Sequence, residues 1–239
     1  MTTTQLLITL SVCGVAVILL TLVGALYVHS RLRRREYELA CMYAWHTTAL
    51  HHYLQPKVPL PEAGGWALSP DLLSFLVRHI EAERPRHAVE LGSGLSTVVL
   101  GRAMKNVGGC LTSIEADTEY LARTRVLLDA EGLDNVTLIH APITPRDGFR
   151  WYDHDAMKEL APIDLLLVDG PPTLTCPLAR YPALPFFWSL LREGAAIVMD
   201  DADRRSEQQT VARWRKDHPK LSLTHLPLYR SPALLRKPG

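Results

Sequence analysis

The feature that most constrains this chain is an alternation of apolar strand patterns with helical patterns from residue 69 onward. Residues 165–168 and 195–199 are apolar throughout, which is typical of parallel strands that helices cover on both faces. Between such segments, apolar residues recur three or four positions apart, the spacing of a helix that buries one face. The alternation predicts an α/β domain with a doubly wound sheet.

The last part of the chain departs from this alternation. Residues 221–237 read as two strands joined by a turn, with no helix between them. Strands joined in this way pair antiparallel, so we expect the final strand to run against the others. The expected strands are 88–91, 111–117, 136–142, 163–172 and 195–201, and the expected helices include 70–83, 118–132, 184–194 and 203–218.

An uncharged apolar run precedes the domain. Residues 6–28 contain no charged side chain and, as a helix, would cross the roughly 30 Å hydrocarbon core of a bilayer. The start, MTTTQ, lacks a basic residue and the run is long, which favours an uncleaved signal anchor over a cleaved signal peptide or a buried helix. The run is followed by Arg31, Arg33, Arg34 and Arg35. We expect a single-pass membrane protein with its N-terminus outside and its domain in the cytoplasm.

These patterns divide the chain into three parts. Residues 1–30 are the expected transmembrane signal anchor, residues 31–68 a juxtamembrane helix and linker, and residues 69–239 the folded domain. Ser69 is the expected N-cap of the first helix of the domain, with Pro70 at its first position.

Composition excludes several classes of function. The net charge is +1, so no global field favours nucleic acid as a partner, and a small or weakly charged substrate is expected instead. The four cysteines are far apart and form no CxxC pair, which argues against a disulfide framework or a zinc site. The sequence does not set the oligomeric state.

The first strand of the domain ends in a turn with two glycines. It reads Glu90-Leu91-Gly92-Ser93-Gly94 and leads into a helix through Leu95-Ser96-Thr97. Such a turn lets backbone N–H groups approach a ligand closely. Dinucleotide dehydrogenases usually carry a third glycine, which is absent here. A carboxylate before the first glycine suits a cationic ligand better than a pyrophosphate.

Further strand ends carry residues suited to an adenosine-containing ligand. Glu115 ends the second strand and can accept hydrogen bonds from both hydroxyls of a ribose. Asp169 ends the fourth strand, and Asp200 and Asp201 end the next. Because ligands in open α/β sheets bind beyond the carboxyl ends of the strands, we expect the site at this edge.

Together, VELGSGLST, SIEAD, IDLLLVDGPP, ARYPALP and IVMDDADRRSEQQTVARW resemble the class I S-adenosylmethionine-dependent methyltransferases. More narrowly, the chain resembles a bacterial small-molecule group whose first motif reads E-x-G-S-G-x-S-T, and more distantly the catechol O-methyltransferases. The resemblance covers roughly residues 69–237. It implies a Rossmann-like sheet of seven strands with an antiparallel last strand, and S-adenosylmethionine as cofactor.

The resemblance also implies a set of site residues. The glycine turn would lie against the methionine part of the cofactor, Glu90 would hold its amino group, and Glu115 would bind the ribose. The implied cofactor-binding residues are Glu90, Gly92, Ser93, Gly94, Ser96, Thr97, Glu115, Ala116, His140, Ala141 and Asp169. Asp169 and Asp200 are the implied catalytic residues.

The three aspartates Asp169, Asp200 and Asp201 also resemble the metal site of catechol-type O-methyltransferases, which makes Mg²⁺ a second candidate cofactor. Two positions depart from that pattern: Asp201 stands where asparagine is usual, and Pro172 where the catalytic lysine is expected. A metal-free site in which Asp169 or Asp200 positions the acceptor is the alternative. Asp201 or Asp203 could instead cap the following helix.

The expected function is therefore transfer of a methyl group to an oxygen or nitrogen of a small-molecule or lipid-like acceptor. Arg180 and Tyr181, in the loop after the fourth strand, are the candidate acceptor contacts. One alternative is a catalytically inactive membrane scaffold that binds an adenosyl ligand. Another is a nicotinamide-dependent oxidoreductase, which the missing third glycine disfavours.

Overall fold

The structure is a computed structural model that describes residues 2–61 and 67–239, without the side chains of residues 5–13. Part of the expected linker therefore lies outside the described residues. The chain divides into two compact units, Met1–Trp45 and His46–Gly239. The elements are α1 (Thr3–Leu54), α2 (Pro70–Glu83), β1 (His87–Leu91), α3 (Leu95–Val107), β2 (Cys110–Glu115), α4 (Thr118–Glu131), β3 (Val136–His140), β4 (Ile143–Arg146), β5 (Phe149–Tyr152), η1 (Asp155–Met157), β6 (Ile163–Val168), η2 (Thr173–Thr175), α5 (Ala183–Phe187), β7 (Leu191–Met199), α6 (Arg205–Asp217), β8 (Ser222–His225) and β9 (Ala233–Arg236).

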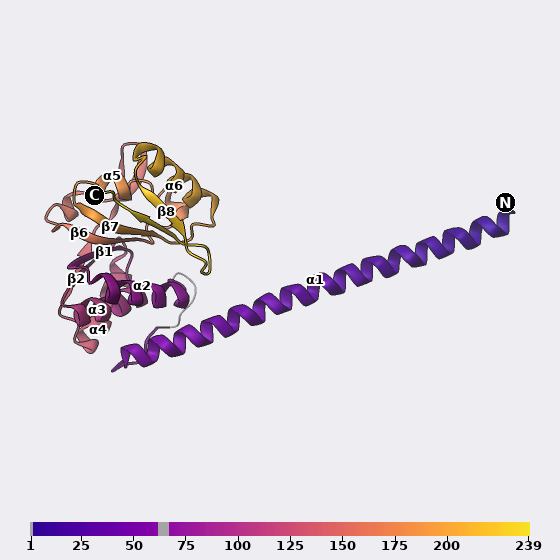
Figure 1. Cartoon of the computed structure of the whole chain (residues 1–239), viewed down its shortest axis with the longest axis horizontal. Helices are drawn as coiled ribbons and strands as arrows, with labels where there is room; N and C mark the ends of the chain where they lie inside the picture. The colour runs from indigo at the N-terminus through magenta and orange to yellow at the C-terminus, as the bar shows by residue number, and fades with distance from the viewer. Residues whose placement is uncertain (1, 62–66) are drawn as a thin grey trace. The chain divides into compact units, whose positions relative to one another are not determined.

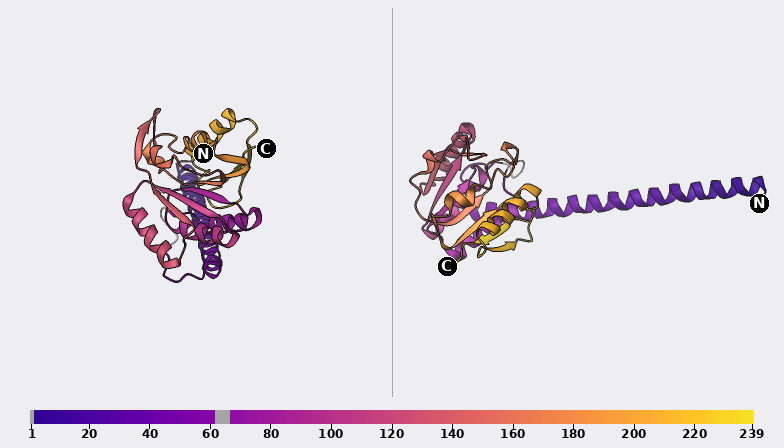
Figure 2. Two further views of the ribbon diagram at one scale, coloured as in Figure 1. Left: turned by 90° about the vertical axis from the view of Figure 1, so that its left-hand side faces the viewer. Right: turned by 90° about the horizontal axis from the view of Figure 1, so that it is seen from above.

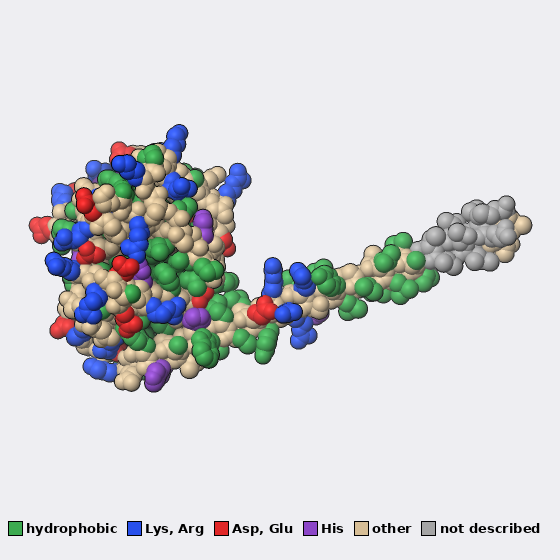
Figure 3. All heavy atoms as spheres, viewed as in Figure 1, with side chains coloured by type: hydrophobic (Ala, Val, Ile, Leu, Met, Phe, Trp, Pro, Cys, Tyr) green, Lys and Arg blue, Asp and Glu red, His purple; other side chains and the backbone are tan. Residues whose placement is uncertain are grey.

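The first unit belongs to a single helix, α1, which runs without a break past residue 30, where the membrane segment is expected to end. Over residues 14–38 its apolar side chains are exposed, for example Val15, Leu20 and Leu26. Figure 3 shows these apolar side chains along the helix, followed by a group of basic ones. Among the described residues, α1 is the helix long and apolar enough to cross a membrane, properties that a signal sequence shares.

The second unit contains a sheet of seven strands in the order β3-β2-β1-β6-β7-β9-β8. The first five are parallel to one another, whereas β9 is antiparallel to both β7 and β8. The sequence-based prediction of a Rossmann-like seven-stranded sheet with an antiparallel last strand is confirmed. A second, two-stranded sheet is the hairpin of β4 and β5.

Helices cover both faces of the large sheet, as Figures 1 and 2 show: α2, α3 and α4 on one face, α5 and α6 on the other. Because side chains alternate along a strand, β6 supplies both cores. Leu165 and Leu167 pack in the cluster beneath α2 and α3, while Leu166 and Val168 pack in the cluster beneath α5 and α6. This burial on both faces explains why the strand is apolar throughout.

One local prediction was wrong, and one local element was not predicted. The helix expected over 184–194 is limited to α5, because residues from Leu191 onward belong to β7, in which Leu191 pairs with Ile163. Gly194, with a φ of 75°, also disfavours a continuing helix. The hairpin of β4 and β5 was not expected as strands, although it packs Trp151 and Tyr152 into the core.

Candidate functional site

Four neighbouring parallel strands, β2, β1, β6 and β7, bring acidic residues to one edge of the sheet. Glu115 ends β2, Glu90 is the penultimate residue of β1, and Asp169 and Asp200 directly follow β6 and β7. From β1 the chain progresses through β2 to β3 in one direction, and β6 and β7 lie on the other side of β1. This reversal between β1 and β6 is the point at which open α/β sheets bind ligands.

The glycine turn connects β1 to α3. Gly92 and Gly94 have φ values of 108° and 141°, which side chains other than hydrogen disfavour. The Gly92 N–H donates to the Ile114 carbonyl at 2.8 Å, which ties the turn to β2. A Cβ atom added at either glycine would meet no atom within 4 Å, so the space above the turn is open. The turn therefore presents the N-terminus of α3 to that space.

Glu90 lies beneath the turn and is almost completely buried. Its Oε2 accepts a hydrogen bond from the Thr97 hydroxyl at 2.8 Å, while Oε1 has no partner among the described residues. Burial raises the pKa of Glu90 to about 7, and the nearby hydroxyls of Ser96, Thr97 and Ser113 have the opposite effect and lower it. An unpartnered buried carboxylate oxygen is costly, and a cationic donor from a ligand would relieve that cost.

Both oxygens of the Glu115 carboxylate accept hydrogen bonds from neighbouring residues. Its Oε1 accepts from the backbone N–H groups of Ala116 and Asp117 at 2.7 and 2.9 Å. Its Oε2 accepts from the Ser93 hydroxyl at 2.9 Å, which connects it directly to the glycine turn. Ser93, predicted as a cofactor contact, therefore orients the carboxylate expected to bind ribose.

The remaining predicted cofactor contacts lie at the end of β3 or behind Glu90. A ring nitrogen of His140 lies 3.1 Å from the Ala116 carbonyl, and the imidazole is exposed. Ala141 is fully buried, and its N–H donates to the Glu115 carbonyl at 2.8 Å. Thr97 is also fully buried, so it reaches a ligand only through Glu90. Direct contact of these residues with a cofactor stays a prediction.

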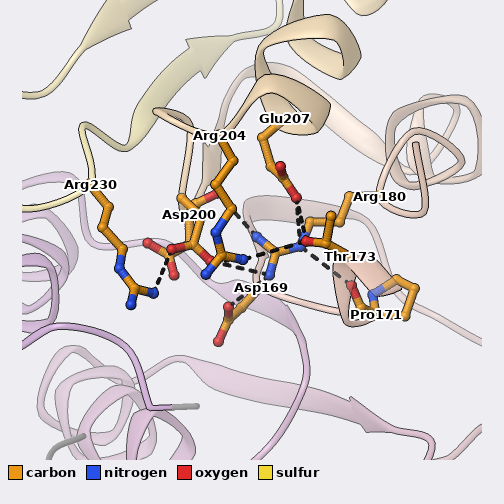
Figure 4. Close-up of polar contacts among 9 residues, drawn as sticks. Asp169, Pro171, Thr173, Arg180, Asp200, Arg204, Glu207 and Arg230 are labelled. Atoms are coloured by element: carbon orange, nitrogen blue, oxygen red, sulfur yellow. Dashed lines mark hydrogen bonds and ion pairs between the residues drawn. The ribbon is translucent and has the colours of Figure 1, made fainter. Parts of the chain in front are cut away.

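The three aspartates at the ends of β6 and β7 meet as expected, with carboxylate oxygens within 4.8 Å of one another. Figure 4 shows that arginines surround them. Asp201 accepts from Arg230 at 2.7 Å through Oδ1 and from Arg204 at 2.8 Å through Oδ2. The predicted helix cap is wrong, because Arg204 stands at the N-cap of α6 and the Asp201 carboxylate binds these guanidinium groups instead.

Arg180 is the centre of this cluster and only 4% of its side chain is exposed. Its guanidinium lies 3.3 Å from Asp169 Oδ1, 3.6 Å from Asp201 Oδ2 and 3.9 Å from Glu207 Oε1. It also donates to the Asp200 carbonyl at 3.1 Å. Burial raises the pKa values of Asp169 and Asp200, and their mutual proximity raises that of Asp200 further.

Comparison with known proteins identifies the domain. Residues 89–202 match the family described as a methyltransferase domain. They form a methyltransferase domain. A comparison with curated proteins found no match. The predicted resemblance to class I S-adenosylmethionine-dependent methyltransferases is confirmed, whereas the narrower E-x-G-S-G-x-S-T group stays a prediction.

Solved structures share the fold of the methyltransferase domain. The SAH-bound methyltransferase PaMTH1 of Podospora anserina is 16% identical, with a TM-score of 0.61 over 84% of this chain and 88% of its own. The O-methyltransferase of Bacillus cereus in complex with SAH is 18% identical, with a TM-score of 0.55 over 83% and 88%. The O-methyltransferase TomG of Streptomyces achromogenes, in complex with SAM, is 18% identical, with a TM-score of 0.56 over 84% and 89%.

The aspartates of the methyltransferase domain do not fit a Mg²⁺ site. Both oxygens of Asp201 and one oxygen of Asp169 already contact guanidinium groups. A divalent cation bound among these carboxylates would have to displace the buried Arg180 and would lie beside further fixed positive charges. Three of the six carboxylate oxygens that could bind Mg²⁺ are therefore already paired with arginines.

Arg180 and Tyr181, predicted together as acceptor contacts, face different surroundings. Arg180 is directed at the aspartates, whereas Tyr181 lines a pocket of about 250 Å³ between the hairpin and the segment around α5. The Tyr181 hydroxyl donates to Asp217 at 2.9 Å, and the Arg213 guanidinium lies 4.0 Å from its ring centre. The pocket is lined by Arg146, Asp147, Phe149, Trp151, His154, Tyr181, Pro182, Pro185 and Phe186.

Sequence reasoning missed several residues of the site. Arg204 and Arg230 are polar residues of a helix start and a loop, and nothing local marks them as partners of Asp201. Tyr152 was also missed, because no strand was expected in the hairpin that carries it. The three aromatic residues of FRWY were the available signal, since aromatic residues are typical of strands.

Proposed function

We propose that this chain is a membrane-anchored methyltransferase that moves the methyl group of S-adenosylmethionine to an oxygen of a small-molecule or lipid-like acceptor. The observation that carries the proposal is the unpartnered oxygen of Glu90 beneath an open glycine turn, with Glu115 beside it. The ammonium group and the ribose of one adenosyl amino acid would suit these two carboxylates. The O-methyltransferases of the same fold that bind SAM or SAH support this cofactor and an oxygen acceptor.

When bound, S-adenosylmethionine supplies an electrophilic methyl group on a sulfonium. The protein's contribution is to hold donor and acceptor in line, because methyl transfer needs little covalent help. Asp169, at the end of β6, lies on the acceptor side, and Arg180 holds its carboxylate at 3.3 Å. We assign Asp200, whose pKa burial raises to about 8, to orienting the acceptor hydroxyl, and Asp169, whose pKa is raised only to about 6, to receiving its proton.

We also propose that α1 anchors the domain on the cytoplasmic side of a membrane. Its exposed apolar side chains and the arginines that follow them support this arrangement. A domain held at a membrane surface would meet lipid-like acceptors at high local concentration. This is the reason to include such acceptors in a screen.

The deciding experiment is calorimetric titration of the full chain in detergent with S-adenosylmethionine, S-adenosylhomocysteine and NAD. Micromolar binding of the first two and none of NAD would support the proposal over a nicotinamide-dependent oxidoreductase. Binding of NAD alone would overturn it. Methyl transfer from a radiolabelled donor to extracted lipids or small phenols would then separate an enzyme from an inactive scaffold.

A further inference from the structure

Tyr152 occupies a central place in the site that no motif indicated. It is the last residue of β5, only 2% of it is exposed, and its ring packs edge-on against Trp151 at 5.0 Å between centres. The hairpin thus holds the phenol rigidly from one side. Its hydroxyl points to the end of β6, because it lies where a side chain of Gly170 would begin.

The backbone conformation at position 170 does not require glycine, because Gly170 is not among the glycines with positive φ. Space is the reason instead. A Cβ atom at this position would overlap Tyr152 Oη and would lie 3.3 Å from Tyr152 Cζ and 3.2 Å from the Leu91 carbonyl oxygen. The missing side chain therefore seats the phenol between the end of β1 and the end of β6, at the switch point of the sheet.

The hydroxyl also lies among the charges of both halves of the site. Burial raises the pKa of Tyr152 above its ordinary value, and the carboxylates of Glu115, Asp169 and Glu90 raise it further, against the effect of Arg180. The phenol is therefore a neutral donor at physiological pH.

We propose that the Tyr152 hydroxyl donates a hydrogen bond to the carboxylate of the methionine part of bound S-adenosylmethionine. The absence of a side chain at Gly170 leaves the space that the hydroxyl occupies in this position. The proposal rests on the proposed function. The glycine turn and Glu90 assign the methionine part of the cofactor to this end of β1. Because Glu90 suits the ammonium group, the adjacent carboxylate needs a donor, and Tyr152 is a donor at that place.

The test compares Tyr152→Phe with the wild type in the full chain, with calorimetry as the readout. We expect binding of S-adenosylhomocysteine to weaken about tenfold, the effect of one hydrogen bond to a charged group. Decarboxylated S-adenosylmethionine lacks the proposed acceptor, so its affinity should be the same for both proteins. Tyr53→Phe is the matched control, because it removes a hydroxyl that accepts from Asn106 outside the site.

A second variant tests the role of Gly170. Gly170→Ala should weaken binding of S-adenosylhomocysteine in the wild type, and by a smaller factor in Tyr152→Phe, because the overlap with Oη is then absent. Equal factors in both backgrounds would overturn the proposal, and so would an unchanged affinity in Tyr152→Phe. If Tyr152→Phe weakens the affinity for S-adenosylhomocysteine and for decarboxylated S-adenosylmethionine by the same factor, the role of the hydroxyl is merely structural. If the wild type binds neither compound, the proposed function itself fails.

Discussion

The Thr97 hydroxyl donates to Glu90 Oε2 at 2.8 Å, so the first turn of α3 and the last part of β1 hold one carboxylate between them. The same Thr97 oxygen accepts from the Gly94 N–H at 3.0 Å. One side chain therefore orders both the glycine turn and the acid beneath it. This arrangement leaves Glu90 Oε1 as the oxygen available to a ligand.

The raised pKa of Glu90 predicts a pH dependence of stability. Between its ordinary value of 4.5 and about 7, Glu90 is protonated in the folded protein and ionised in the unfolded chain. The folded state then binds more protons, so the free energy of unfolding falls by up to about 3 kcal/mol as pH rises through this interval. Above about pH 7 this contribution no longer changes with pH. Glu90→Gln should flatten this slope in urea denaturation, whereas the exposed Glu119→Gln should not.

The same carboxylate predicts a pH dependence of binding. S-Adenosylmethionine should bind more tightly as pH rises from about 6 to 7.5, because the ammonium group favours ionised Glu90. Calorimetry across this range checks the trend in the wild type. An identical trend in Glu90→Gln would assign the dependence to another group.

Replacement of Glu115 should abolish most cofactor affinity. Glu115→Ala removes the expected acceptors of two ribose hydroxyls and the partner of Ser93. We expect a loss of about a hundredfold in affinity for S-adenosylhomocysteine. Asp134→Ala is the control and should bind S-adenosylhomocysteine normally. It removes an exposed carboxylate that follows the C-terminal end of α4, whereas Glu115 precedes the N-terminal end. A normal affinity in Glu115→Ala would contradict the assignment of the ribose site.

Loss of Arg180 should destabilise the domain far more than loss of Arg204. Arg180→Met leaves buried carboxylates without a counter-charge, for which we expect about 3 kcal/mol of lost unfolding free energy. Arg204 is 40% exposed, so Arg204→Met should cost less than about 1 kcal/mol. Tryptophan fluorescence in urea reports both, since Trp151 and Trp214 lie in the core. Equal losses would argue against the central role of Arg180.

Cofactor binding and methyl transfer should not depend on a divalent metal, because arginines already pair with Asp169 and Asp201, two of the three carboxylates that would bind it. The affinity for S-adenosylhomocysteine should agree within twofold in EDTA and in Mg²⁺, and titration with Mg²⁺ alone should give no heat. Activity, once an acceptor is known, should persist in EDTA. Loss of activity in EDTA with recovery in Mg²⁺ would contradict this prediction and support the metal site that the resemblance implies.

The proposed orientation predicts where native thiols are accessible. Cys41 and Cys110 are exposed and follow the apolar run, so they should lie in the cytoplasm. A thiol reagent that cannot cross membranes should label them only after the cells are permeabilised. Labelling in intact cells would indicate the opposite orientation, with the domain outside the cytoplasm. Replacing the arginines at positions 31, 33, 34 and 35 by glutamate should weaken the preference.

Much of the fold and half of the site follow from the sequence. Periods of two and of three to four residues are local, and parallel strands that alternate with helices must end at the same edge of a sheet. Hence Glu90, Glu115 and Asp169 could be placed together before any coordinates. The helix expected over 184–194 failed because Leu191 joins β7 through pairing with Ile163, a contact between distant segments.

The content of the acceptor half was decided by tertiary structure. The sequence indicated that Asp169, Asp200 and Asp201 would meet, but a metal and a set of arginines are equally compatible with three converging carboxylates. Arg180 and Arg230 arrive from separate loops, and Tyr152 from a hairpin, so no local period relates them to the aspartates. Local sequence patterns are enough to predict the sheet and the acids along its edge. Packing between distant segments sets which cations and which hydroxyl face those acids.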